Sequence, residues 1–187
     1  MNKNLAAALS GGAVLVLALT GCSNGSGNND KLDAWAKTVC NAVQPQAKKI
    51  AAANAAIQKQ TSDNSAPADV RKTDAQAFQD MSDAYKAIGA AVKSAGAPNV
   101  DNGAKKQQAA VTELNGISAQ YAALKKQMEQ LNTKDQGKFA DGLKDVATRL
   151  DKLSQTGNDA LKNLEAGEVG QAMAKQASCK ATPAPTG

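Results

Sequence analysis

The chain has 187 residues, a formal net charge of +5 at pH 7, three cysteines and no histidine. The lack of histidine excludes Ser-His-Asp and Cys-His nucleophilic sites, Cys-x-x-Cys-His haem attachment and the usual zinc sites. No glycine-rich phosphate-binding motif occurs, and no basic run reaches the roughly five to eight residues of a nucleic-acid patch. We therefore expect a protein that is not an enzyme, holds no metal or cofactor and has no nucleic-acid partner.

Residues 1–21 are typical of a secretory signal peptide. Lys3 precedes the apolar segment Leu5–Leu19, and small residues follow it. The stretch Leu19-Thr20-Gly21-Cys22 resembles a bacterial lipobox. This resemblance implies diacylglyceryl transfer to the Cys22 thiol and cleavage between Gly21 and Cys22. Two acyl chains anchor a protein stably, so we expect it on the outer face of the cell membrane, partly released to the extracellular medium. A plain secreted helical protein is the alternative.

Composition divides the rest of the chain into three parts. Residues 22–30 combine the cysteine with a Gly/Ser/Asn-rich stretch, which is typical of a flexible tether. Residues 181–187 are Pro-rich and are predicted to be disordered. Residues 31–180 lie between them and have the length of one domain.

Apolar residues at helical spacing predict a first helix over residues 32–57. Pro45 lies inside this pattern and is expected to kink the helix, with a break as the alternative. A second helix is predicted to begin at Pro67, because proline suits the first turn of a helix. Gly96 followed by Pro98 predicts its end.

The third helix is predicted to begin between Asp101 and Gly103 and to end at Asn132-Thr133. Thr133 followed by Gln136 matches a capping box and predicts the start of the fourth helix. Heptad spacing carries that helix from Phe139 to Leu164, with a split at Gly157-Asn158 left open. A separate short helix over residues 168–178 then leads to Cys179.

Four long amphipathic helices with short connections predict an all-α, antiparallel up-down four-helix bundle with a short C-terminal helix. A long coiled-coil hairpin that dimerises is the structural alternative. With Cys22 assigned to lipid, Cys40 and Cys179 remain. Disulfides persist in exported proteins, and an up-down bundle brings its chain ends together, so we predict a Cys40–Cys179 disulfide. Two free buried thiols are the alternative.

Two further features invite a functional interpretation. Asp74 is the one carboxylate on a predicted apolar stripe and could bind a cation inside the bundle. We expect instead that it lies at the edge of the stripe or at an end of the bundle and reaches water. Trp35, Tyr85 and Tyr121 could line a small apolar pocket, but ordinary core packing is the expectation.

The order of these features resembles that of small secreted or lipid-anchored actinobacterial proteins. Such proteins are Ala/Lys/Asp-rich helical chains with a lipobox, a tether, a Trp-x-x-x-x-Cys element and a final cysteine. Here that element is Trp35-Ala36-Lys37-Thr38-Val39-Cys40, and the final cysteine is Cys179. The resemblance implies a cellular location but no activity. We expect function through binding or structural contact, with the membrane and an unidentified protein or envelope component as partners. A carrier for a small apolar ligand is the alternative.

Overall fold

The computed structural model describes residues 26–62, 65–156 and 159–180. The predicted signal peptide, its cleavage site at Gly21-Cys22, the lipidated Cys22 and the predicted tail over 181–187 lie outside these residues. The described part of the chain forms helices and no strand. The helices are α1 (Ser26–Ser62), α2 (Pro67–Ser94), α3 (Gly103–Glu129), α4 (Gln136–Thr156), α5 (Asp159–Glu165), α6 (Glu168–Lys175) and α7 (Ala177–Lys180).

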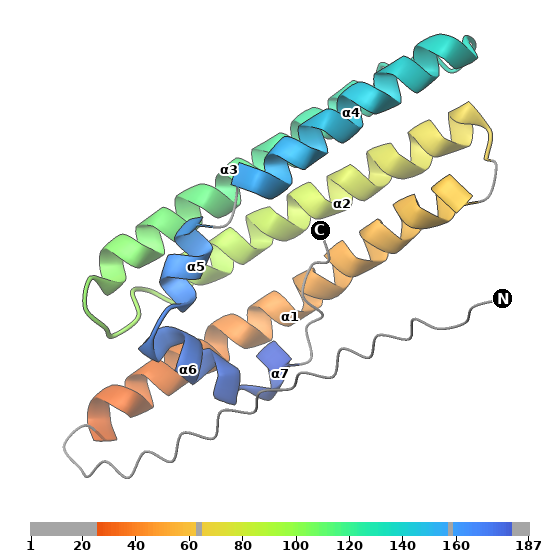
Figure 1. Ribbon diagram of the computed structural model, residues 1–187. Coiled ribbons are helices and arrows are strands. Elements are labelled where there is room, and N and C mark those ends of the chain that lie inside the picture. The colour runs from red at the N-terminus through yellow and green to blue at the C-terminus, as the bar shows by residue number, and fades with distance from the viewer. Residues whose placement is uncertain (1–25, 63–64, 157–158, 181–187) are drawn as a thin grey trace, which may run out of the picture.

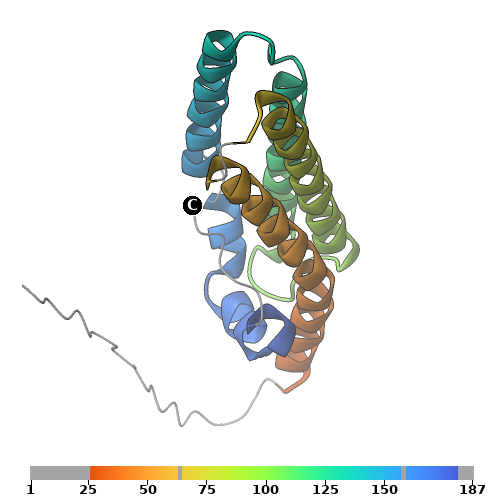
Figure 2. The same cartoon turned by 90° about the vertical axis from the view of Figure 1, so that its right-hand side faces the viewer.

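The long helices pack antiparallel in chain order (Figure 1). α2 lies between α1 and α3, and α4 runs back along α3. α5 continues along α3, while α6 and α7 pack against α1 (Figure 2). These contacts confirm the predicted all-α antiparallel bundle with long helices.

The bundle has two distinct ends (Figure 1). The proximal end holds the first turns of α1, the turn between α2 and α3, and the turn between α5 and α6. The distal end holds the last turn of α1, the first turn of α2 and the turn between α3 and α4.

The structure corrects the predicted bounds of the first and fourth helices. α1 begins at Ser26, so it includes part of the tether predicted over residues 22–30. It also continues through Pro45 without a break, because Val43 and Ile50 on either side pack into the core. The fourth helix is divided, since α4 ends at Thr156 and α5 begins at Asp159.

The capping box predicted from Thr133 and Gln136 is wrong. Asp135 precedes the first residue of α4, and its Oδ1 accepts a hydrogen bond from the Lys138 backbone N–H at 3.1 Å. Asn132 Oδ1 instead accepts from the Lys134 N–H at 2.9 Å, within the turn. An aspartate therefore supplies the N-cap, as the preference for short polar side chains at this position allows.

The predicted short helix over residues 168–178 is two helices. α6 ends before Gln176, whose backbone is extended with ψ of 126°. The Gln176 side chain turns back, and its Nε2 donates to the Ala172 carbonyl at 3.2 Å. This bend redirects the chain so that α7 lies against α1.

Two clusters of buried side chains form the core, and small aliphatic residues are frequent in both. Tyr85 is half-buried and packs against both clusters, which joins them at the middle of the bundle. The proximal cluster includes Leu32, Trp35, Ala36, Val39, Ile88, Leu114, Val169 and Ala172. The distal cluster includes Ala53, Phe78, Met81, Ile117, Leu124, Met128, Val146 and Leu153.

The predicted disulfide is confirmed. Cys40 and Cys179 are joined by an S–S bond of 1.99 Å, with their Cα atoms 5.1 Å apart. The bridge connects α1 to α7 across a sequence separation of 139 residues. It therefore closes almost the whole described domain, and Cys40 is fully buried.

Candidate functional site

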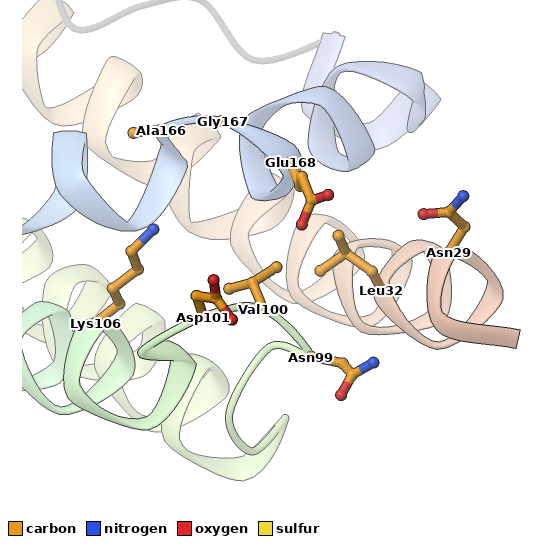
Figure 3. A pocket seen from close by; sticks show the side chains of 9 residues that line it. All are labelled: Asn29, Leu32, Asn99, Val100, Asp101, Lys106, Ala166, Gly167 and Glu168. Atoms are coloured by element: carbon orange, nitrogen blue, oxygen red, sulfur yellow. The ribbon is translucent and has the colours of Figure 1, made fainter. Parts of the chain in front are cut away.

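The proximal end of the bundle contains an open cavity of about 620 Å³ (Figure 3). It lies between the first two turns of α1, the α2–α3 turn and the α5–α6 turn. This volume falls within the range of small-molecule sites, roughly 300 to 1,000 Å³. The lining residues are Asn29, Leu32, Asn99, Val100, Asp101, Lys106, Ala166, Gly167 and Glu168.

Backbone geometry fixes the wall formed by the α2–α3 turn. Gly96 has φ of 76° and Asn102 has φ of 58°, so the chain turns twice through the left-handed region. The Trp35 Nε1–H of α1 donates to the Gly96 carbonyl at 2.8 Å. Gly103 lies so close to Pro98 that an added Cβ would stand 2.0 Å from the proline carbonyl oxygen. The Trp35 hydrogen bond therefore ties the turn to α1.

The opposite wall depends on a second sharp turn. Gly167 has φ of 69° and separates α5 from α6. A Cβ on Gly170 would stand 2.0 Å from the Glu165 carbonyl oxygen, so α6 folds closely over the end of α5. The Lys175 ammonium pairs with Asp33 of α1 at 3.2 Å, which holds α6 beside α1.

The floor of the cavity is apolar and its rim is charged. Leu32 is only 4% exposed, and Val100 packs against the same cluster of buried residues. Asp101, Lys106 and Glu168 form no ion pair with another described residue. Such an arrangement can hold a polar ligand by charge-assisted hydrogen bonds while its apolar part covers Leu32 and Val100.

Charged side chains from three segments line the cavity (Figure 3). Lys106 extends from α3 toward the α5–α6 turn. Glu168 points from the start of α6 toward the α2–α3 turn, where Asp101 lies. Both carboxylates also stand near helix N-termini, where negative charge stabilises the helix.

Asp74 is more deeply buried than a position at the edge of the stripe suggests. Asp74 is 7% exposed, and its Oδ1 has no hydrogen-bond partner. Burial raises the pKa of this carboxyl to about 6. The reason is helical register, because Phe78 and Met81, four and seven residues later, are also buried. The described residues contain no group of three or more His, Cys, Asp or Glu side chains that could hold a metal ion.

The aromatic residues pack as core side chains, as expected. Tyr85 stacks on Tyr121 with ring centroids 5.5 Å apart, and Phe78 lies 6.2 Å from Tyr121. Trp35 belongs to the proximal cluster and bonds to Gly96. Burial, with the neighbouring Tyr85, raises the pKa of Tyr121 to about 12.

Sequence reasoning did not find the proximal cavity. Gly96, Pro98 and Gly167 are visible in the sequence as helix-ending signals, and they do end helices. The sequence contains no signal that the two turns face each other across α1. That information comes only from tertiary packing.

Comparisons with protein-family models, with curated proteins and with solved structures found no match to this chain. Among the described residues, no helix combines the length and apolar character needed to cross a membrane.

Proposed function

We propose that this protein is an exported lipoprotein, anchored to the outer face of the cell membrane through lipid on Cys22. Its helical domain acts by binding or structural contact and not by catalysis. The lipobox-like stretch Leu19–Cys22 and the preceding apolar segment support this address.

The Cys40–Cys179 disulfide is the observation that carries the proposal. Disulfides persist in oxidising compartments and are rare in the cytosol, so this bridge fits an exported domain. The pairing also accounts for two of the three cysteines. Cys22 is then the one cysteine left, and it stands where the lipobox-like stretch places the modified residue.

The fold suggests how an anchored domain would present itself. α1 begins at Ser26, four residues after Cys22, so the proximal end faces the membrane. The distal end, with the Gln130–Asp135 connection between α3 and α4, then points away from it. We expect a protein or envelope partner to contact this distal end or the flanks of the bundle.

Cell fractionation tests the proposed membrane anchoring through Cys22. The unchanged chain should be found in the membrane fraction, whereas Cys22→Ala should be released into the medium or remain unprocessed. The double variant Cys40→Ser/Cys179→Ser is the matched control, because it removes cysteines without touching the anchor. A Cys22→Ala chain that stays membrane-bound at normal size would contradict the proposal.

In-cell cross-linking followed by mass spectrometry tests the mode of action. Cross-linkable residues placed on the distal end should capture one recurring partner, and the same residues at the proximal end should not. Repeated absence of any captured component would count against function by contact.

A further inference from the structure

We propose that the proximal cavity binds the headgroup of a zwitterionic membrane lipid, one that carries a phosphate and an amine, such as phosphatidylethanolamine. This inference rests on the lipid anchor proposed above. It goes further by assigning a ligand class to a site on the domain itself.

The position of the cavity is the first argument. Four Cα–Cα steps separate Cys22 from Ser26, and an extended chain spans at most ~14 Å over them. Asn29, which lines the cavity, lies one turn further along α1, a rise of ~5 Å. The cavity is therefore within ~20 Å of the anchored residue along the chain, which places it near the lipid headgroups.

The distribution of charge is the second argument. Lys106 of α3, Asp101 of the α2–α3 turn and Glu168 at the start of α6 line the same cavity, with Asp101 drawn on the side of Lys106 (Figure 3). None of the three is paired with another described residue. An amine between the two carboxylates and a phosphate at Lys106 would satisfy all three charges at once.

The rigidity of the walls is the third argument. Gly103 packs closely against the Pro98 carbonyl and Gly170 against the Glu165 carbonyl, so the backbone is tightly packed in both turns. Trp35 and Asp33 add bonds from α1 to the α2–α3 turn and to α6. A site that is already formed loses less conformational freedom on binding.

A zwitterionic ligand could come from a membrane or from solution, so the test separates these sources. It uses the chain over residues 22–187 with Cys22→Ser, which cannot carry lipid at residue 22. Binding is measured at physiological salt to vesicles of phosphatidylcholine alone, with phosphatidylethanolamine added, or with phosphatidylglycerol added. Free phosphoethanolamine is titrated separately and followed through the backbone amide signals of Asn99, Val100 and Gly167.

Retention on phosphatidylethanolamine vesicles should exceed retention on phosphatidylcholine by about tenfold, the effect of one or two charge-assisted hydrogen bonds. Lys106→Gln and Glu168→Gln should each abolish this preference. Lys105→Gln and Asp141→Asn remove the same charges outside the cavity and should leave it unchanged. Circular dichroism on each variant confirms that the helices are retained.

Three results would overturn the inference. Equal retention on all vesicles would show that the cavity does not recognise the headgroup. Stronger retention on phosphatidylglycerol would show only that a basic protein is attracted to an acidic surface. Saturable binding of free phosphoethanolamine without vesicle preference excludes the lipid as the source. Because this chain carries no lipid, each result stands apart from whether Cys22 is modified in cells.

Discussion

Ser82 and Ser118 form a reciprocal pair of hydrogen bonds across the buried interface of α2 and α3. The Ser82 hydroxyl donates to the Ser118 carbonyl at 2.8 Å, and the Ser118 hydroxyl donates to the Ser82 carbonyl at 2.8 Å. Their Oγ atoms are 3.2 Å apart, and both residues are buried. A slip of either helix breaks both bonds, so the pair fixes the register of the two helices.

Replacing either serine with alanine should destabilise the domain by about 1 kcal/mol, the typical net value of one hydrogen bond. The double variant Ser82→Ala/Ser118→Ala should cost less than the sum, because the contact between the hydroxyls is lost only once. Urea unfolding of the four proteins in the cycle measures this coupling. Ser94→Ala, at an exposed helix position, corrects for the better helix propensity of alanine. Strict additivity would show that the hydroxyls act independently.

Opening the Cys40–Cys179 bridge should lower the free energy of unfolding by up to ~5 kcal/mol, the chain-entropy value for a loop of this length. α6 and α7 should lose much of their order, because they are the helices that the bridge holds against α1. Denaturation of the Cys40→Ser/Cys179→Ser variant, compared with the oxidised chain, provides the measurement. Identical unfolding curves would mean that the disulfide adds no stability beyond that provided by helix packing.

Asp74 should make stability depend on pH. Burial raises its pKa from 3.8 to about 6 in the folded chain, so its contribution to stability is greatest below pH 4 and is lost as pH rises through 6. The free energy of unfolding of Asp74→Asn should therefore equal that of the parent near pH 4. At pH 7 it should be higher than that of the parent by up to about 3 kcal/mol. Unfolding measured at both pH values tests this, with the exposed Asp141→Asn as control. If the variant and the parent differed in free energy of unfolding by the same amount at both pH values, the burial of a titrating carboxyl would be contradicted.

Gly103→Ala and Gly116→Ala form a matched pair within α3. A Cβ at residue 103 would stand 2.0 Å from the Pro98 carbonyl oxygen, whereas one at residue 116 meets nothing within 4 Å. The first change should destabilise by about 2 kcal/mol or more through overpacking. The second should stabilise by about 0.5 to 1 kcal/mol, the usual gain of alanine over glycine in a helix. Thermal unfolding of both variants checks the opposite signs.

The helix bounds that could be predicted are those set by local chemistry. Pro67 begins α2 and the Gly96-x-Pro98 element follows its end, because proline and glycine restrict or free the backbone wherever they stand. The disulfide was predictable for a different reason. Once the helix count gives an up-down bundle, topology brings Cys40 and Cys179 to one place.

The features that could not be predicted depend on tertiary contacts. Asp135 is the N-cap although Thr133 fits the capping box better, because the turn after α3 places Asp135 next to the first helical residue. Asp74 is buried because of where its stripe faces. Glu113 of α3 accepts a hydrogen bond from the Leu161 N–H in the first turn of α5, a contact between residues 48 positions apart. No local pattern carries that information.

The intact mass of the protein purified from membranes tests the central claim most directly. A diacylglyceryl group on an N-terminal Cys22 is predicted, together with a loss of two hydrogen atoms for the Cys40–Cys179 bridge and no thiol that reacts with an alkylating reagent before reduction. After reduction, Cys40 and Cys179 should alkylate and Cys22 should not. A mass that retains residues 1–21, or alkylation of Cys22, would contradict the account of an exported, lipid-anchored bundle.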